Sequence, residues 1–280
     1  MVSWPDPGTR VTVRYRRPAG SVPPLTDAVG HLLAVDPIVR VRTKSGAVVE
    51  FAPSDAVALR VLTDTPIRTS QIRALEHAAA AAWPGAEQLW LQGWLLRAGH
   101  GGGLVVNSAV PLDLSAQLST VPAIVEWYAE RGLTPRLAVP DRLLRLPPGP
   151  TAEHVERMLV RDLSSVTPAS RPDPSVTLEQ RSGEGGVELA FGTHAGTAVA
   201  RAAVTDAPDG TRWVGISAVA DDDERTAAEV YEALLAWGAD RGATRGYLSI
   251  PDTGAAPLAA ALGFRPHHRR RYVPVPPASV

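Results

Sequence analysis

Two stretches of this 280-residue chain repeat one another almost without gaps, and this repeat strongly limits the folds that the chain can adopt. The first stretch runs from Ser108 to Asp141, and the second runs from Ser217 to Asp252. Three markers recur in the same order, Ser-Ala-Val, Trp-x-Ala-[Glu/Asp]-Arg-Gly-x-Thr and Pro-Asp, at offsets of 109, 110 and 111 residues. Such a period is too long for a solenoid and indicates a duplicated domain.

Each copy is predicted to form a strand, a loop, a helix, a turn and a second strand. The turns are placed at Gly132 and Gly242, and a hairpin is expected ahead of each copy, over residues 89–107 and 187–215. Residues 164–174, "SSVTPASRPDP", are rich in Pro and Ser and predict a linker. We therefore expect two α/β halves, 66–170 and 171–280.

The first 65 residues predict a separate small β domain. "RVTVRYR" alternates apolar and polar residues, and three further strand-like runs follow, separated by turn dipeptides at Asp36–Pro37 and Ser45–Gly46. Four or five short strands bury enough surface only if they curl into a barrel, so we expect a barrel over residues 1–65. A helix should follow, with Thr69 or Ser70 as its N-cap and its end near Trp83–Pro84.

The composition excludes several classes of function. The chain has no cysteine, so disulfides, thiolate metal sites and cysteine nucleophiles are absent. The net charge is −1, which makes nucleic acid an unexpected partner. No run of about eighteen apolar residues and no signal-like start occurs, so we expect a cytoplasmic protein with no membrane partner.

The second half carries phrases that resemble the GNAT N-acetyltransferase superfamily. These are "LLAWGADRGATRGYLSI" and the Leu-Gly-Phe-Arg-Pro run at 262–266, which are similar to the third helix, fifth strand and terminal corner of that fold. The first half resembles a second GNAT-like copy, and "APSDAVALRVL" resembles the end of an SH3-like barrel. The resemblance implies an α/β (α+β) fold: an SH3-like barrel followed by two GNAT-like halves.

The resemblance also implies a site for acetyl-CoA. In the superfamily the strand before the third helix pairs with the pantetheine, and the start of that helix binds the pyrophosphate. The matching positions here form the predicted cofactor site: Ala218, Val219, Arg225, Thr226, Ala227 and Ala228. Arg225 stands where the superfamily has its first glycine, and Asp222 stands where it has Gln or Arg.

Three aspartates and a glutamate, residues 221–224, precede this helix and leave three interpretations open. They can cap the helix, they can ligate a metal, or they can turn outward while Arg225 and the amides of residues 226–228 bind CoA. Because two unit charges at 4 Å interact by about 4 kcal/mol at an effective dielectric of 20, an acid facing the pyrophosphate would weaken binding. We assign no metal site.

No catalytic residue is identified from the sequence. The usual tyrosine of the superfamily corresponds to Ala259, and no acid lies within "RWVGISAVA". "HGGG" at 100–103 resembles an esterase strand, but no Gly-x-Ser-x-Gly elbow accompanies it, so we interpret the glycines as a hairpin bend. His267 and His268 are expected to alternate along a final strand, with its arginines solvated on one face. Five tryptophans are expected in the core: Trp83, Trp90, Trp94, Trp127 and Trp237.

Two functional hypotheses remain. The first is an N-acetyltransferase that uses acetyl-CoA on an unidentified small-molecule or protein amine, with the cofactor in the second half and the first half a degenerate copy. The alternative is a catalytically inactive GNAT-like binding or assembly module. The barrel has eight basic and five acidic residues within 1–62, and we expect a solvated barrel face, with a peptide or RNA contact as the alternative.

Overall fold

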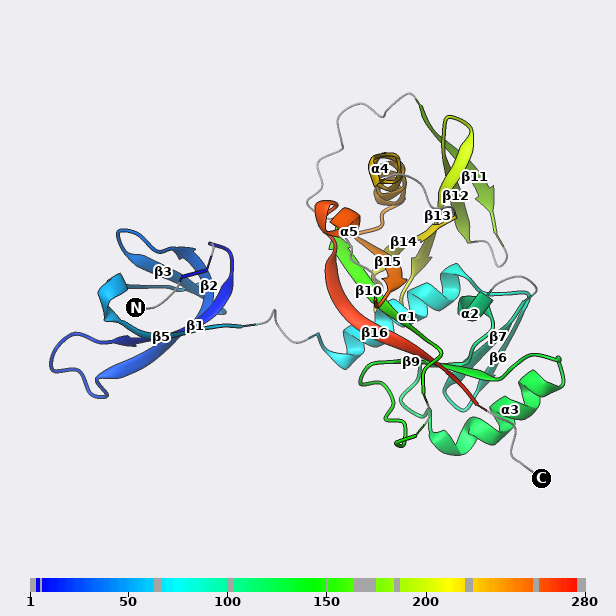
Figure 1. Ribbon diagram of the computed structural model, residues 1–280, viewed down its shortest axis with the longest axis horizontal. Coiled ribbons are helices and arrows are strands. Elements are labelled where there is room, and N and C mark those ends of the chain that lie inside the picture. The colour runs from blue at the N-terminus through cyan, green and yellow to red at the C-terminus, as the bar shows by residue number, and fades with distance from the viewer. Residues whose placement is uncertain are drawn as a thin grey trace. The chain divides into compact units, whose positions relative to one another are not determined.

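The structure is a computed structural model that describes residues 4–5, 7–62, 67–99, 103–149, 151–163, 175–183, 187–219, 224–253 and 257–275. It divides the chain into two compact units, Met1–Pro66 and Ile67–Val280 (Figure 1). The linker expected at 164–174 and the acids Asp221–Asp223 lie outside the described residues. Among the described residues, no helix is both long and apolar enough to cross a membrane.

The first unit is a five-stranded antiparallel sheet in the order β4-β3-β2-β1-β5. Its strands are β1 (Arg10–Arg16), β2 (Leu25–Ala34), β3 (Val39–Thr43), β4 (Val48–Phe51) and β5 (Ala56–Val61), with a 3₁₀ turn η1 (Pro53–Asp55) before β5. The alternation predicted for β1 is confirmed, because Val11 and Val13 are buried while Arg14 is exposed. The core of the unit consists of Val11, Val13, Ala28, Leu32, Val39, Val41 and Phe51.

The second unit contains the remaining elements. Its helices are α1 (Thr69–Ala82), α2 (Gly103–Val106), α3 (Val121–Ala129), α4 (Glu224–Asp240) and α5 (Pro257–Ala261), with a 3₁₀ turn η2 (Leu118–Thr120). Its strands are β6 (Glu87–Leu91), β7 (Trp94–Ala98), β8 (Val110–Pro111), β9 (Arg136–Pro140), β10 (His154–Asp162), β11 (Val176–Ser182), β12 (Glu188–His194), β13 (Thr197–Asp206), β14 (Arg212–Ala218), β15 (Arg245–Pro251) and β16 (Arg265–Pro274).

An eight-stranded sheet in the order β11-β12-β13-β14-β15-β10-β16-β9 runs through this unit, beside a three-stranded sheet β6-β7-β8. The helix α4 packs on one face of the large sheet, against Val214, Ile216 and Leu248. The alanine-rich α1 packs on the other face, against Trp213 and Tyr247 (Figure 1). Successive side chains of a strand point to opposite faces of the sheet. Val214, Ile216 and Leu248 therefore face α4, whereas Trp213 and Tyr247 face α1.

The repeat in the sequence corresponds to a repeated local structure. Arg131 lies over the ring of Trp127 and pairs with Glu87 on β6, and Arg241 lies over Trp237 and pairs with Glu188 on β12. Gly132 and Gly242 both have positive φ, 64° and 82°, and each follows its helix, as a C-terminal cap requires. The parallel pair β14/β15 has a short counterpart in the parallel bridge between Ala109 and Leu137.

The two expected halves share one hydrogen-bonded sheet. Strand β10 lies before the expected boundary at residue 170, yet it pairs with β15 on one side and with β16 on the other. Strand β9 pairs with the outer edge of β16. The division at residue 170 stays a prediction, and residues 67–280 form one compact unit.

Several local expectations need correction. The N-cap of α1 is Arg68, whose N–H donates to the side chain of Gln71 at 2.8 Å, so Thr69 is already helical. The hairpin of the first half turns at Gln92–Gly93 between β6 and β7, whereas Gly103 begins α2. Residues 100–102 are not among the described residues.

The tryptophan prediction is only partly right. Trp94, Trp127 and Trp237 are buried as expected. Trp90 is 54% exposed, and Trp83 is half-buried at the end of α1. Trp90 is exposed because it lies on β6, a short strand whose residues are exposed or half-buried along its whole length.

Candidate active site

Strands β14 and β15 run parallel and then part. The pairing runs from Trp213 with Arg245 to Ile216 with Leu248. Beyond Ile216 and Leu248 the described residues of the two strands form no further pairs. A cavity of about 260 Å³ lies at this point and is lined by small side chains of both strands, among them Ser217 and Ser249. Parting strands leave backbone groups that an extended ligand can pair with, as an added strand would.

The structure places two of the predicted cofactor residues at the end of β14. Ala218 pairs with Ala200 of β13 and lines the cavity. Val219 is half-exposed, and its N–H donates to the carbonyl of Val199 at 2.9 Å. Because successive N–H groups of a strand point to opposite sides, the N–H of Ala218 points toward the side from which β15 has parted.

The other four predicted residues form the first turn of α4. Thr226 and Ala227 are buried, and Ala228 is half-buried. The side chain of Arg225 is 87% exposed and pairs with Glu229 one turn further on, at 3.1 Å. The first amides of a helix carry partial positive charge, so this end of α4 suits an anion.

Glu156 of β10 brings a carboxylate into the same cavity. The side chain is only 12% exposed, and it accepts hydrogen bonds from Arg270 at 2.7 Å and from the hydroxyl of Tyr272 at 3.2 Å. Burial disfavours the ionised form, but Arg270 outweighs this effect and holds the pKa of Glu156 below its ordinary value. His154, on the same strand, lies 3.6 Å from the other oxygen of Glu156.

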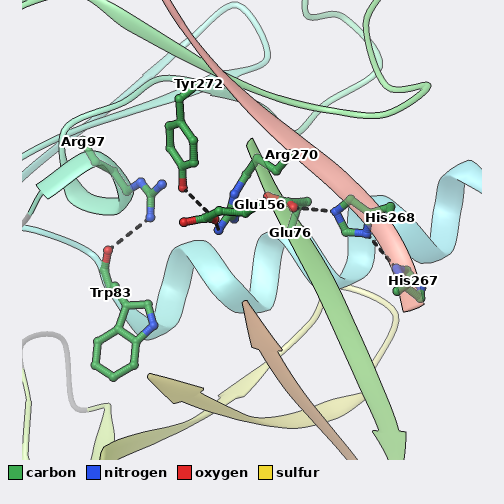
Figure 2. A network of polar contacts seen from close by, with 8 residues as sticks. All are labelled: Glu76, Trp83, Arg97, Glu156, His267, His268, Arg270 and Tyr272. Atoms are coloured by element: carbon green, nitrogen blue, oxygen red, sulfur yellow. Dashed lines mark hydrogen bonds and ion pairs between the residues drawn. The ribbon is translucent and has the colours of Figure 1, made fainter. Parts of the chain in front are cut away.

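A second carboxylate, Glu76 of α1, fixes Arg270 from the opposite side (Figure 2). Its Oε2 accepts a hydrogen bond from Arg270 at 3.0 Å, and its Oε1 lies 2.7 Å from Nε2 of His268. The side chain is 1% exposed, so burial raises the pKa, yet Arg270 and His268 lower the pKa of Glu76 to about 2. Arg270 therefore lies between two ionised carboxylates.

The predicted alternation along the final strand is present, but its arginines do not all face solvent. Arg269 is exposed and pairs with Asp252, whereas Arg270 is 4% exposed and belongs to the buried network. His268 is also buried, and its Nδ1 lies 2.7 Å from Nδ1 of His267. Burial and the neighbouring His268 lower the pKa of His267 to about 4.

Tyr247 of β15 lies at the point where the strands part. Its hydroxyl is buried, and among the described residues it has no hydrogen-bond partner. Gly215 on β14 makes room for the ring, because a Cβ there would lie 2.2 Å from the Tyr247 hydroxyl. Burial raises the pKa of Tyr247, so the phenol is neutral.

Glu76, Glu156 and Arg201 were assigned no function from the sequence alone. A signal was present, however, because each is a charged residue within an apolar or alternating segment: "ALEHAAAAA", "HVERMLV" and "TAVARAAV". Burying an ionised side chain is costly unless it is paired or functional. Among the described residues, no group of three or more His, Asp or Glu side chains gathers as a metal site.

Comparisons with known proteins agree with this architecture. Residues 69–187 and 182–273 match the family described as "Probable histone acetyltransferase Rv0428c C-terminal". Residues 5–60 match the "Rv0428c N-terminal Sm-like domain". The chain is 61% identical over 297 residues to the "Probable histone acetyltransferase Rv0428c" of Mycobacterium tuberculosis (strain ATCC 25618 / H37Rv), covering 98% of this chain and 97% of the relative.

Two solved structures are similar to parts of this chain. A GCN5-related N-acetyltransferase from Kribbella flavida has a TM-score of 0.49 and 16% identity, over 73% of this chain and 95% of its own. Another from Sphaerobacter thermophilus has a TM-score of 0.37 and 16% identity, over 53% of this chain and 64% of its own.

The family matches confirm the small N-terminal β domain and the acetyltransferase function predicted from the sequence. The chain belongs to the family of the probable histone acetyltransferase Rv0428c, which combines an Sm-like domain with a C-terminal acetyltransferase region.

Proposed function

We propose that this protein transfers an acetyl group from acetyl-CoA to a primary amine where β14 and β15 part. The observation that carries the proposal is the cavity of about 260 Å³, which is lined by both strand ends and by the carboxylate of Glu156. Family membership supports acetyl transfer, and the Mycobacterium tuberculosis relative is named for a histone acceptor. We retain the cytoplasmic location expected from the sequence, because acetyl-CoA is available there.

The residues of the donor site fit the parts of acetyl-CoA. Acetyl-CoA supplies a thioester whose acetyl carbon an amine can attack. The N–H of Ala218 would pair with an amide of the pantetheine at the open end of β14, and Val219, whose own N–H bonds to Val199, would hold this strand end in place. The amide of Thr226, in the first turn of α4, would face the pyrophosphate, with the small side chains of Ala227 and Ala228 beside it, and Arg225 would exchange Glu229 for a phosphate oxygen.

Glu156 is proposed to receive the acceptor amine. Its ionised carboxylate would bind the ammonium group, which must first lose one proton to water to give the neutral amine that attacks the thioester. The carboxylate would then accept the second proton, which the nitrogen releases as it attacks, and the CoA thiolate leaves. Because the nitrogen becomes positively charged and strongly acidic as the C–N bond forms and the C–S bond breaks, a carboxylate with a lowered pKa is basic enough for this step. Arg270 and Tyr272 hold the carboxylate in place.

Calorimetric titration with acetyl-CoA and CoA, followed by an assay of thiol release with primary amines, tests the proposal. The Glu156→Gln variant should bind acetyl-CoA normally but lose about 10²-fold or more in kcat, the usual scale for general base catalysis. Glu179→Gln is the control, because Glu179 is an exposed carboxylate on β11. A thermal melt verifies that both variants fold.

The same titration decides between the enzyme and a catalytically inactive binding module. The pairing of Arg225 with Glu229 favours the inactive module, because it engages the cation expected to bind phosphate. No binding of acetyl-CoA at millimolar concentration would contradict the enzyme. Binding and turnover would exclude the inactive module.

A further inference from the structure

Arg201 of β13 lies in the same cavity and is not explained by acetyl transfer alone. The side chain is half-buried, and its guanidinium carbon lies 4.2 Å from the ring centroid of Trp83. The buried Arg97 donates a hydrogen bond to the backbone carbonyl of Trp83 at 3.2 Å, and the ring of Trp83 points away from Arg97 (Figure 2). Arg201 therefore lies against an aromatic surface at the end of α1.

Three other arginines lie over a tryptophan ring, and the two nearest to their rings also pair with a carboxylate. Arg131 lies 3.8 Å from the ring of Trp127 and pairs with Glu87. Arg241 lies 4.5 Å from the ring of Trp237 and pairs with Glu188 at 2.7 Å.

For Arg201, the residues that the structure describes provide the ring but no carboxylate. Burial lowers the pKa of Arg201, which means that its charge is poorly solvated. Stacking occupies only the flat face of a guanidinium, and its N–H donors lie in the plane, where they match a carboxylate. The in-plane N–H donors of Arg201 are therefore arranged to bind an anion.

The sheet register places this anion site and Glu156 on the same face. Arg201 is paired with Ser217, and Met158, two residues from Glu156, is paired with Ser249. Because side chains alternate between faces, these residues all project toward the face covered by α1. Three strand spacings separate β13 from β10, roughly 14 Å or more at about 4.8 Å each. A single ligand of suitable length can therefore contact the side chains of Arg201 and Glu156 at its two ends.

The charges of the cavity distinguish its two ends. Arg270 also lines the cavity, but Glu76 and Glu156 already neutralise it. Arg201 is left as the cation available to an acidic group, and Glu156 as the carboxylate available to an ammonium group. A cationic peptide would place further positive charge near Arg201, which is unfavourable in a partly desolvated site.

We propose that the acceptor is a small amine that also carries a carboxylate several bonds away, such as free lysine or an ω-amino acid. Its carboxylate binds Arg201 against Trp83, and its amine lies at Glu156. The volume of about 260 Å³ suits a molecule of this size. The inference rests on the proposed acetyl transfer and names the chemical class of its acceptor.

Two pairs of acceptors that differ mainly in the carboxylate test the inference. They are 6-aminohexanoate against hexylamine, and lysine against cadaverine. We expect kcat/KM to be about tenfold or more higher for the carboxylate member of each pair. Arg201→Gln should abolish this preference by lowering kcat/KM for the carboxylate member of each pair, whereas Arg201→Lys should retain part of it. Arg181→Gln is the control, because Arg181 is stacked on Phe191 at the exposed β11 and does not line the cavity.

A binding measurement separates this inference from the proposed function. Calorimetric titration of the wild type and of Arg201→Gln with 6-aminohexanoate requires no turnover, and only the wild type should bind it. Equal rates within each acceptor pair, or a preference for a lysine-rich histone-tail peptide, would overturn the inference while leaving acetyl transfer intact. Failure to bind acetyl-CoA or to release thiol would overturn acetyl transfer, and the titration would still decide whether Arg201 binds a carboxylate.

Discussion

Among single residues, Glu76 is the most deeply buried ionised group that the structure describes. Its carboxylate lies between His268 and Arg270, which are more than 190 residues away along the chain. The pKa of Glu76 falls from 4.5 to about 2 in the folded protein. The ionised form therefore stabilises the fold fully above about pH 4.5, and this stabilisation is lost as the pH falls toward 2.

The Glu76→Gln variant should lower the free energy of unfolding at pH 7 by about 3 kcal/mol, because it leaves a buried arginine with one neutral partner. This deficit should shrink as the pH falls from 7 to 3, since Glu76 then becomes protonated in the unfolded chain while it stays largely ionised in the folded wild type, which lowers the stability of the wild type. Urea unfolding at pH 7, 5 and 3 measures it, with Glu179→Gln as an exposed control. A deficit that stays constant with pH would contradict the assignment.

At the scale of elements, the junction between β14 and α4 decides whether the cofactor binds. The strand end offers backbone groups, and the helix offers its first amides and the exposed Arg225. Glu224 and Glu229 lie on the same helix, and their negative charges oppose the binding of a phosphate. Such exposed charges act weakly and are screened by salt.

Arg225→Ala should weaken the binding of CoA by roughly 1–3 kcal/mol, the scale of a hydrogen bond to a charged group. Glu229→Gln should strengthen it, because the substitution removes the carboxylate that pairs with Arg225 one turn further on, and the gain should be largest at low salt. Calorimetry at two salt concentrations measures both, with Arg181→Ala as the control. Equal affinity in all three variants would mean that Arg225 takes no part in binding.

At the scale of the whole molecule, the chain consists of two units with different kinds of core. The first unit buries a core made entirely from its own strands. The second unit joins its two expected halves through β10, which lies between β15 and β16. Residues 67–280 should therefore fold together, whereas the first unit does not depend on any strand outside it.

Residues 1–66 expressed alone should fold into a β domain with a stability of only a few kcal/mol, because a core of this size buries little surface. Residues 67–280 alone should bind acetyl-CoA as the full chain does. Circular dichroism with thermal melting tests the first statement, and calorimetry tests the second. An unfolded spectrum for residues 1–66 would show that its core is not sufficient.

Most helices and strands of this protein could be predicted from local periodicity in its sequence. The alternation of Val11 and Val13 predicted β1, the alanine-rich run predicted α1, and the repeated Trp-Arg-Gly markers predicted α3 and α4 with their capping glycines. These features depend on residues within a few positions of one another, so the sequence displays them directly. The resemblance to acetyltransferases came from the same local phrases.

The charged groups of the site are brought together by long-range packing. Glu156 reaches the cavity because β10 lies beside β15, and Arg270 finds Glu76 because β16 packs over α1. Arg201 meets Trp83 although 118 positions separate them. Such contacts depend on strand order and register, which long-range packing sets and no local pattern encodes. The site is therefore assembled from residues that carry no motif of their own.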